Sequence, residues 1–362
     1  MAMRGFLFDG EVIRKKYNHN AVEKQRTLQQ RRCSALFASL QASRYIYRQH
    51  FRHQLCDLPR VNILLVLILL VVLFMTAVSL VLLVIGPILL LQPHRRAIEW
   101  YRTRTNLLHP SDLGLLHEDV HLKTKEGIDL RGWLIKASSG VKSTILILHG
   151  VSESKIAGLR MAKEFHDRGY NVFLYDSRRH GESGGKFCTY GYHEKVDARL
   201  TIDYLLSRND LQVGKIGMFG WSMGAAVAIQ VAAVDTRVAA VVAESGFATL
   251  RTVFDYYQKR MIKLPWHYLR NIVIKRSEYL AGFTANDVSP IEAVKQIHVP
   301  IFLLHGTEDN LIKYNYSEKV YNAANQPKEL WLIPGARHND MMEVGGEEYT
   351  RRITEFFEEH LG

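Results

Sequence analysis

The chain has 362 residues, with 47 Lys and Arg against 36 Asp and Glu, a formal net charge of +11. This excess lies wholly in residues 1–109, which hold 16 basic and 5 acidic residues, whereas residues 110–362 hold 31 of each. The neutral balance of the larger part excludes the basic footprint of a nucleic-acid-binding domain. The length is sufficient for one large α/β domain with additional segments.

Residues 1–60 form a basic N-terminal arm that is rich in Gln and Arg, with 12 basic and 4 acidic residues. The stretch Ala21–Gln54 favours a helix that lies on a membrane surface, and a disordered tail is the alternative. The apolar residues expected on one side of this helix are Leu28, Leu36, Phe37 and Leu40.

Residues 61–91 contain no charged side chain over 31 positions and are dominated by Leu, Val and Ile. About 20 such residues are needed to cross the hydrocarbon core of a bilayer, and 31 are too few for two crossings with a turn. The pattern therefore predicts one transmembrane helix, which Gly86-Pro87 kinks or ends. A buried core helix rarely reaches this length, and the segment lies too far from the start for a cleaved secretory peptide.

The orientation of this helix is predicted from the basic residues on its two sides. Four Arg residues lie close on each side, so the local positive-inside comparison gives no preference. The charge of the whole arm favours an N-terminus in the cytoplasm and residues 113–362 on the far side of the membrane. Of the three cysteines only Cys188 falls in that larger part, so no disulfide framework or metal motif is expected.

After a stem at residues 92–112, the pattern predicts an α/β catalytic domain over residues 113–362. Two alternating runs, 118–124 and 128–135, predict a hairpin, and strand-like and helical runs then alternate to the C-terminus. Such alternation is typical of a mostly parallel central sheet with helices on both faces. Strands are expected at 144–148, 172–175, 215–219, 238–243, 299–304 and 330–333, and helices at 156–168, 194–207 and 225–231.

Residues 244–298 interrupt the alternation with interleaved aromatic and basic residues. This insertion predicts a helical cap over the pocket. An aromatic roof near a membrane indicates acyl chains as substrate, and ordinary helix packing is the alternative.

The stretch Gly220-Trp221-Ser222-Met223-Gly224 reads G-x-S-x-G, with a strand-like run before it and an Ala-rich helical run after it. This context is that of a nucleophile elbow, in which a strained turn exposes the serine hydroxyl. Gly220 and Gly224 are expected because side chains there would clash with neighbouring chain segments. A glycine-rich turn of another α/β fold is the alternative.

Two later loops carry the partners that a nucleophilic serine needs, in the chain order Ser, acid, His. An apolar run leads into the loop with Asp309, the expected orienting acid, whose neighbour Glu308 is the alternative. Another apolar run leads into the loop with His338, the expected general base. A loop acid such as Asp309 is, taken alone, more often a turn residue, and a loop histidine such as His338 is more often merely exposed. Their order in the chain after Ser222 supports their joint assignment as acid and base.

The apolar run 143–148 ends in His149-Gly150-Val151-Ser152, where backbone N–H groups would face a tetrahedral intermediate. The Val151 and Met223 N–H groups are the expected oxyanion hole, the latter because it follows the nucleophile. A simple strand-ending turn is the alternative for the first loop.

From Leu113 to the C-terminus, the chain resembles the α/β-hydrolase superfamily. Residues 176–183 resemble its D-x-R-x-H-G-x-S segment, and residues 305–309 resemble its H-G-x-x-D acid loop, which favours Asp309. The likeness is greatest to membrane-anchored bacterial hydrolases of the serine-aminopeptidase-like branch. The run Arg178-Arg179-His180 has Arg where many relatives have Gly. The resemblance implies a hydrolase of carboxylic esters, thioesters or amides without a cofactor, and it names no substrate.

Together these patterns predict a membrane-anchored serine hydrolase that cleaves an ester or thioester of a lipid-like acid through an acyl-enzyme on Ser222. A serine peptidase with the same triad is the second hypothesis, and a non-catalytic anchored scaffold is the third. The expected location is the bacterial inner membrane, with the catalytic domain outside the cytoplasm. The expected partners are the membrane and a small acyl substrate.

Overall fold

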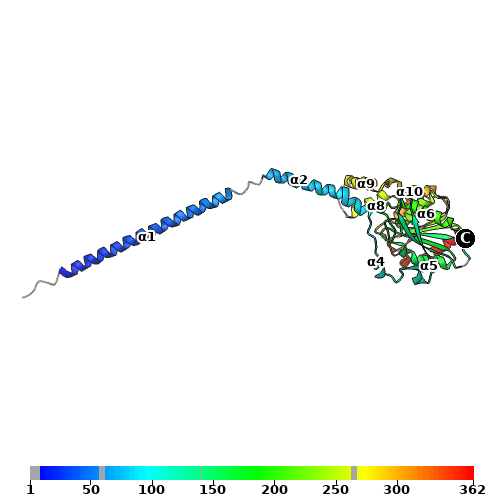
Figure 1. Ribbon diagram of the computed structural model, residues 1–362, viewed down its shortest axis with the longest axis horizontal. Coiled ribbons are helices and arrows are strands. Elements are labelled where there is room, and N and C mark those ends of the chain that lie inside the picture. The colour runs from blue at the N-terminus through cyan, green and yellow to red at the C-terminus, as the bar shows by residue number, and fades with distance from the viewer. Residues whose placement is uncertain (1–8, 57–61, 139, 262–266) are drawn as a thin grey trace, which may run out of the picture. The chain divides into compact units, whose positions relative to one another are not determined.

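The computed structural model describes residues 9–56, 62–138, 140–261 and 267–362 (Figure 1). The chain divides into two compact units, Met1–Met75 and Thr76–Gly362. Most of the first unit is the helix α1 (Asp9–Cys56), whose side chains are exposed over residues 23–51. The helix expected over 21–54 lies inside α1, while residues 1–8 and 57–60 of the arm lie outside the described residues.

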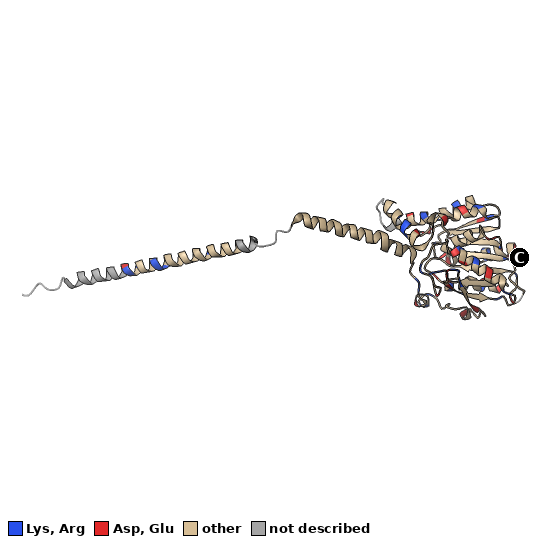
Figure 2. Ribbon diagram, turned by 45° about the horizontal axis from the view of Figure 1, so that its top comes forward, with Lys and Arg blue, Asp and Glu red and all other residues tan. Residues whose placement is uncertain are grey.

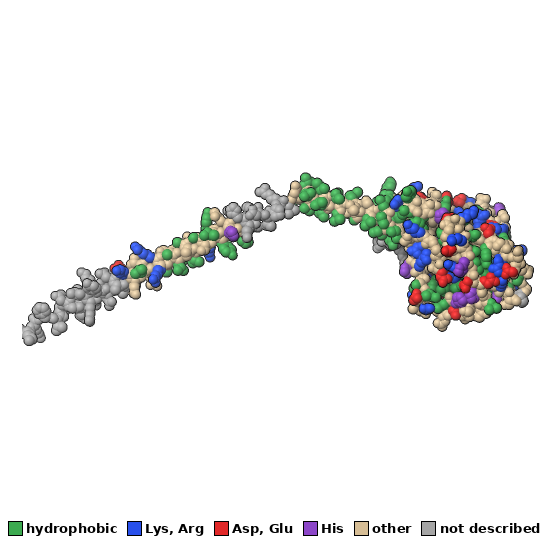
Figure 3. All heavy atoms as spheres, viewed as in Figure 1, with side chains coloured by type: hydrophobic (Ala, Val, Ile, Leu, Met, Phe, Trp, Pro, Cys, Tyr) green, Lys and Arg blue, Asp and Glu red, His purple; other side chains and the backbone are tan. Residues whose placement is uncertain are grey.

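The apolar segment is helical over its whole described length, and Val61 lies outside the description. It comprises α2 (Ile63–Leu80), the π-helical turn η1 (Val81–Ile85) and α3 (Gly86–Leu91). Ile63–Leu91 is long enough and apolar enough, by length and composition, to cross a membrane. Figure 2 shows no charged residue along α2, and Figure 3 shows its largely hydrophobic surface.

Gly86-Pro87 does not end the helix. A proline lacks the N–H that a regular α-helix needs at this position, so the backbone must adjust nearby. It does so in the preceding turn, where the Gly86 N–H donates to the Val81 carbonyl, five residues back. A π-helical turn is a common form of such an adjustment.

The last turns of the apolar helix belong to the interior of the second unit. Pro87 and Leu91 are buried there, whereas no residue of α2 is. The Tyr190 hydroxyl donates to the Leu90 carbonyl at 2.6 Å, and the Cys188 N–H donates to the Leu91 carbonyl at 2.8 Å. Within the apolar stretch, an exposed helix is therefore followed by a short buried end.

The second unit is built on an eight-stranded sheet with the order β1-β2-β4-β3-β5-β6-β7-β8. β2 is antiparallel to both of its neighbours and the remaining pairs are parallel, so the sheet is mostly parallel as predicted. The strands are β1 (Glu118–Lys123), β2 (Asp129–Ile135), β3 (Thr144–Leu148), β4 (Asn171–Tyr175), β5 (Ile216–Trp221), β6 (Val238–Glu244), β7 (Ile301–Gly306) and β8 (Lys328–Ile333).

Helices cover both faces of this sheet. One apolar core joins it to α6 (Glu194–Ser207), α7 (Met223–Ala232) and α11 (Asn315–Ala323), and another joins it to α5 (Leu159–Asp167) and α12 (Met341–Leu361). Every residue of β3 is buried, which is typical of a parallel strand covered on both faces. The short helices are α4 (Ile98–Arg102), η2 (Pro110–Leu113), η3 (Lys155–Gly158), η4 (Ala285–Asp287), α10 (Pro290–Ala293) and η5 (Val294–Gln296).

Between β6 and β7 the chain forms the helical insertion, with α8 (Leu250–Met261) and α9 (His267–Ala281). Phe254 and Phe283 pack with Leu91 in a third apolar core. Tyr268 and Tyr279 on α9 are instead exposed. Among the side chains that the structure describes, the insertion therefore contains both buried and exposed aromatic residues.

Candidate active site

Ser222 lies at the sharp turn between β5 and α7. Its backbone has φ 54° and ψ −114°, a conformation that is strained for a residue with a side chain. The Ser222 N–H donates to the Glu244 carbonyl of β6 at 2.8 Å, which holds the turn against the neighbouring strand. Such strain persists only where the surroundings impose it, and here the sheet does so.

Gly220 and Gly224 permit this turn because other backbone segments pass close to both. A Cβ on Gly220 would overlap the carbonyl group of Gly224, and a Cβ on Gly224 would overlap the carbonyl of Leu148. The close approach of Gly224 to Leu148 packs the N-terminus of α7 directly against the end of β3. The two segments expected to supply oxyanion donors are thereby neighbours.

The structure brings the side chains of Ser222, His338 and Asp309 together. His338 Nε2 lies 3.0 Å from Ser222 Oγ, and His338 Nδ1 lies 2.6 Å from Asp309 Oδ2. Because a carboxylate only accepts, Nδ1 carries the ring proton and Nε2 is free to accept a proton from the serine. This arrangement has the geometry of a nucleophile, a base and an orienting acid.

Asp309 is held as a buried anion by several donors. The Leu311 and Ile312 N–H groups each donate to its Oδ1 at 2.8 Å, and His305 Nε2 lies 3.1 Å from Oδ2. Burial alone raises the pKa of Asp309, but the hydrogen bonds from His305 and His338 outweigh it and hold that pKa below its ordinary value. Its neighbour Glu308 is exposed.

The loop after β3 carries Val151, the expected oxyanion donor, and Met223 is the first residue of α7. His149 fixes the start of this loop. Its Nε2 accepts the Ser177 N–H at 2.9 Å, so the proton is on Nδ1, which lies 2.8 Å from the Gly150 carbonyl. Burial lowers the pKa of His149, which keeps the ring neutral.

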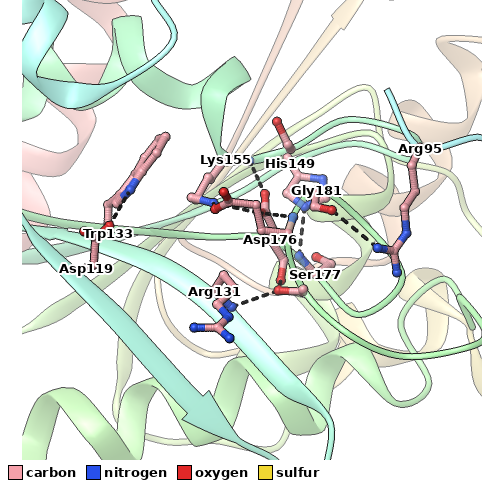
Figure 4. A network of polar contacts seen from close by, with 12 residues as sticks. Arg95, Asp119, Arg131, Trp133, His149, Lys155, Asp176, Ser177 and Gly181 are labelled. Atoms are coloured by element: carbon pink, nitrogen blue, oxygen red, sulfur yellow. Dashed lines mark hydrogen bonds and ion pairs between the residues drawn. The ribbon is translucent and has the colours of Figure 1, made fainter. Parts of the chain in front are cut away.

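The segment after β4 supports the same loop through the network in Figure 4. The buried carboxylate of Asp176 accepts the Lys155 backbone N–H, the Lys155 ammonium and the Glu182 N–H, at 2.7, 2.7 and 2.9 Å. Arg95 of the stem reaches the carbonyl of Gly181 at 3.4 Å (Figure 4). The D-x-R-x-H-G-x-S segment thus acts as a scaffold behind the loop after β3.

Glu153 joins the stem, the loop after β3 and the elbow. Its Oε2 accepts the Trp221 indole N–H, and it also accepts the Gly150 N–H at 3.2 Å. Its Oε1 forms an ion pair with Arg96 of the stem at 3.0 Å. Three segments that are distant in sequence therefore meet on one carboxylate beside the serine.

A cavity of about 340 Å³ opens next to His338. Its wall includes Trp221, Glu153 and the buried Glu244, which lies opposite Trp221 in the β5–β6 register. Burial raises the pKa of Glu244 to about 7, although the hydrogen bond from the Tyr349 hydroxyl opposes the shift. Stem residues that line the same cavity are Arg96, Trp100, Tyr101, Thr105 and Leu107.

Sequence reasoning missed Glu153, Glu244 and Arg96. Their only signal was position, because Glu153 follows Gly150 closely and Glu244 comes directly after the strand predicted over 238–243. Apart from this site, one group within the described ranges has metal-type geometry. His109, His117 and Asp119 place their ligand atoms within 4.8 Å of one another, although Asp119 already accepts the Trp133 indole N–H.

Two family models match parts of the second unit. A family model described as X-Pro dipeptidyl-peptidase (S15 family) matches residues 149–278, and one described as serine aminopeptidase, S33, matches residues 284–345. The chain is 30% identical over 234 residues to the uncharacterized protein YqkD of Bacillus subtilis, covering 64% of this chain and 76% of that relative.

Two further relatives carry more descriptive names. The alpha/beta hydrolase domain-containing protein WAV2 of Arabidopsis thaliana is 26% identical over 257 residues, covering 69% of this chain and 82% of the relative. A solved structure of the Pyrococcus furiosus esterase Pf2001 aligns with a TM-score of 0.62 and 29% identity, over 75% of this chain and 99% of that one. The chain belongs to the α/β-hydrolase superfamily. This confirms the superfamily and the fold class expected from the sequence, and it makes the chain an esterase- or peptidase-like hydrolase.

Within this α/β-hydrolase, the turn at Ser222 and the two loops with Asp309 and His338 all lie at the carboxyl ends of parallel strands. Ligands of open parallel sheets bind at that edge. The positions of the three side chains thus agree with the general rule for α/β folds as well as with one another.

Proposed function

We propose that this α/β-hydrolase is a membrane-anchored serine hydrolase that cleaves a carboxylic ester or thioester of a lipid-like acid. The single observation that carries the proposal is the chain of contacts from Ser222 Oγ through His338 to Asp309. The helix Ile63–Leu91 supports the anchoring, because its length and composition suit a membrane crossing. The charge of the arm favours a catalytic domain outside the cytoplasm.

The proposed reaction has two steps. Ser222 Oγ attacks the acyl carbon while His338 Nε2 takes the hydroxyl proton, and the same proton then passes to the departing alcohol or thiol. Water next attacks the acyl-enzyme with His338 again as base, which releases the acid and restores the serine. Asp309 keeps its charge throughout and stabilises the imidazolium that forms. The Val151 and Met223 N–H groups are the proposed donors to the oxyanion of each tetrahedral intermediate.

The test is covalent labelling of the full chain by a fluorophosphonate. We expect the wild-type protein to take up label and Ser222→Ala to take up none. Ser154→Ala is the matched control, because the Ser154 hydroxyl is buried without a hydrogen-bond partner in the described structure. Absence of label on the wild-type protein would contradict the hydrolase proposal and favour the anchored scaffold.

A serine peptidase with the same triad is the second candidate, and the descriptions of the two matching family models favour it. Esters, thioesters and aminoacyl amides pass through the same tetrahedral intermediate, so the triad does not separate them. A panel of propyl esters, thioesters and aminoacyl amides of increasing acyl length separates the candidates. Faster turnover of the amides would replace the ester proposal by the peptidase.

A further inference from the structure

Helix α9 presents an aromatic and basic face to the outside of the second unit. Tyr268, Ile272 and Tyr279 lie on one side of the helix, and they are 86%, 41% and 78% exposed. The opposite side carries Ile274 and Ser277, which are buried. Large exposed apolar groups that gather on one helix face mark an interaction surface more often than a solvated one.

This face borders the apolar helix. A groove of about 530 Å³ is lined by Leu83 from the π-helical turn and by α9. Close contact between the two helices sets the groove, because a Cβ on Gly86 would lie 3.0 Å from the Val273 side chain. The α9 residues that line the groove are Tyr268, Asn271, Ile272, Lys275, Arg276 and Tyr279.

The length of the exposed part of the apolar helix places α9 relative to a bilayer. Within the described chain, Pro87 is the first buried residue of this helix, so the uncharged stretch from Ile63 to Ile85 contains no buried residue. At the rise of an α-helix this part is about 35 Å long, close to the thickness of the hydrocarbon core of about 30 Å. Leu83 therefore lies near one end of such a crossing, and α9 beside it lies at headgroup level. Tyr side chains are enriched at that level.

Two basic side chains complete the face. The Lys275 side chain is largely exposed, and its ion pair with Glu278 is long, at 3.6 Å. The Arg276 guanidinium lies 5.2 Å from the centre of the Tyr279 ring, and its buried Nε has no hydrogen-bond partner within the described structure. Phosphate oxygens are strong acceptors for such groups, and anionic headgroups attract basic residues near the membrane surface.

We propose that α9 lies in the membrane interface, where the groove beside Leu83 takes an acyl chain of an anionic phospholipid and Lys275 and Arg276 contact its phosphate. This inference rests on the proposed function, because it takes the chain to be membrane-anchored. It places the helical insertion of the hydrolase against the bilayer and gives a lipid-like substrate a short route from the membrane.

The first test is photo-crosslinking of the full chain in vesicles of phosphatidylcholine and phosphatidylglycerol. Benzoylphenylalanine replaces Tyr268 or Tyr279, and the exposed Tyr314, at the start of α11, is the matched control position. We expect crosslinks to lipid from positions 268 and 279 and none from 314. Crosslinks to another protein in place of lipid, or equal lipid yields at the three positions, would overturn the proposal.

The second test addresses the headgroup. We expect phosphatidylglycerol to crosslink at position 279 in preference to phosphatidylcholine, by about fivefold for each basic residue. The variant Lys275→Gln with Arg276→Gln should lose this preference, as should wild-type protein at high ionic strength. The double variant Lys295→Gln with Lys319→Gln removes the same amount of charge elsewhere and should retain the preference for phosphatidylglycerol. Competition by free glycerol phosphate would indicate a soluble anion instead and contradict a lipid site.

These readouts do not depend on catalysis. If Ser222 takes up no fluorophosphonate but positions 268 and 279 crosslink to lipid, the proposed function fails and the membrane surface stands. If Ser222 takes up the label and neither position crosslinks to lipid, the proposed hydrolase function stands and the membrane surface is contradicted. Thermal unfolding checks that each variant is folded.

Discussion

Trp221, the residue before Ser222, donates its indole N–H to Glu153, and the same carboxylate accepts the N–H of Gly150. The elbow and the loop after β3 are therefore held at a fixed separation. Arg96 of the stem pairs with the other oxygen of this carboxylate. Because the proposed oxyanion donors lie on these two segments, Glu153 is a positioning residue for the proposed reaction.

We expect Glu153→Ala to lower kcat for a soluble ester by about thirtyfold, since it removes two hydrogen bonds worth about 1 kcal/mol each. KM should change little, because the loop acts on the transition state rather than on the bound ester. Glu153→Gln retains an acceptor and should recover part of the loss. Glu343→Ala, on the wall of the same cavity, is the matched control. A lower melting temperature with unchanged kcat would show a purely structural role.

Asp309→Asn should lower kcat by about 10⁴-fold while the protein stays folded, because the amide no longer fixes the tautomer of His338. The neighbouring Glu308→Gln removes the same charge from an exposed position and should leave kcat unchanged. Steady-state kinetics with a p-nitrophenyl ester measure both. Comparable losses in the two variants would reopen the choice between these acids.

Gly224→Ala should destabilise the second unit by about 3 kcal/mol and abolish fluorophosphonate labelling, because the added methyl overlaps the Leu148 carbonyl and moves the elbow. Gly184→Ala is the control. A Cβ there meets its nearest atom at 3.4 Å, an ordinary contact. Thermal unfolding and labelling report the two effects. A Gly224→Ala protein that labels at the wild-type rate would show that the close approach is not required.

The raised pKa of Glu244 predicts a pH-dependent stability. The folded protein holds this proton up to about pH 7, whereas the unfolded chain releases it near 4.5. Stability contributed by this group therefore falls as the pH rises from about 4.5 to 7 and is constant above, a change of about 3 kcal/mol. Glu244→Gln cannot ionise, so its stability relative to wild type should rise over that window.

Urea unfolding of both proteins between pH 4 and pH 8 measures this difference. Glu343→Gln serves as the comparison, because it lies on the same cavity wall at the surface. A constant difference between wild type and Glu244→Gln across the range would contradict a buried acid that takes up a proton on folding.

The sequence predicted the strands of the sheet well, because buried parallel strands such as β3 are short continuous apolar runs between turn residues. The elbow could also be predicted, since G-x-S-x-G restricts backbone conformation as well as chemistry. Asp309 and His338 followed from their places after two such runs. The local pattern carried this information in each case.

The residues that sequence reasoning missed take their roles from partners distant in the chain. Glu153 is an ordinary loop acid until Trp221 and Arg96 are placed beside it. Glu244 has its raised pKa because the sheet and α12 bury it. The burial of the last turns of the apolar helix could not be predicted for a related reason. Leu91 is equally suited to lipid and to a protein core, and only the packing of the insertion decides between them.

Because Leu91 is fully buried and its carbonyl accepts the Cys188 N–H, the end of the apolar helix is part of the folded interior of the second unit. A protease that cut just after Leu91 would free this residue from the third apolar core. Phe254 and Phe283 would then lose its packing and become exposed. If this helix crosses a membrane as proposed, release of the folded second unit would therefore require a cut ahead of Gly86, within the proposed span.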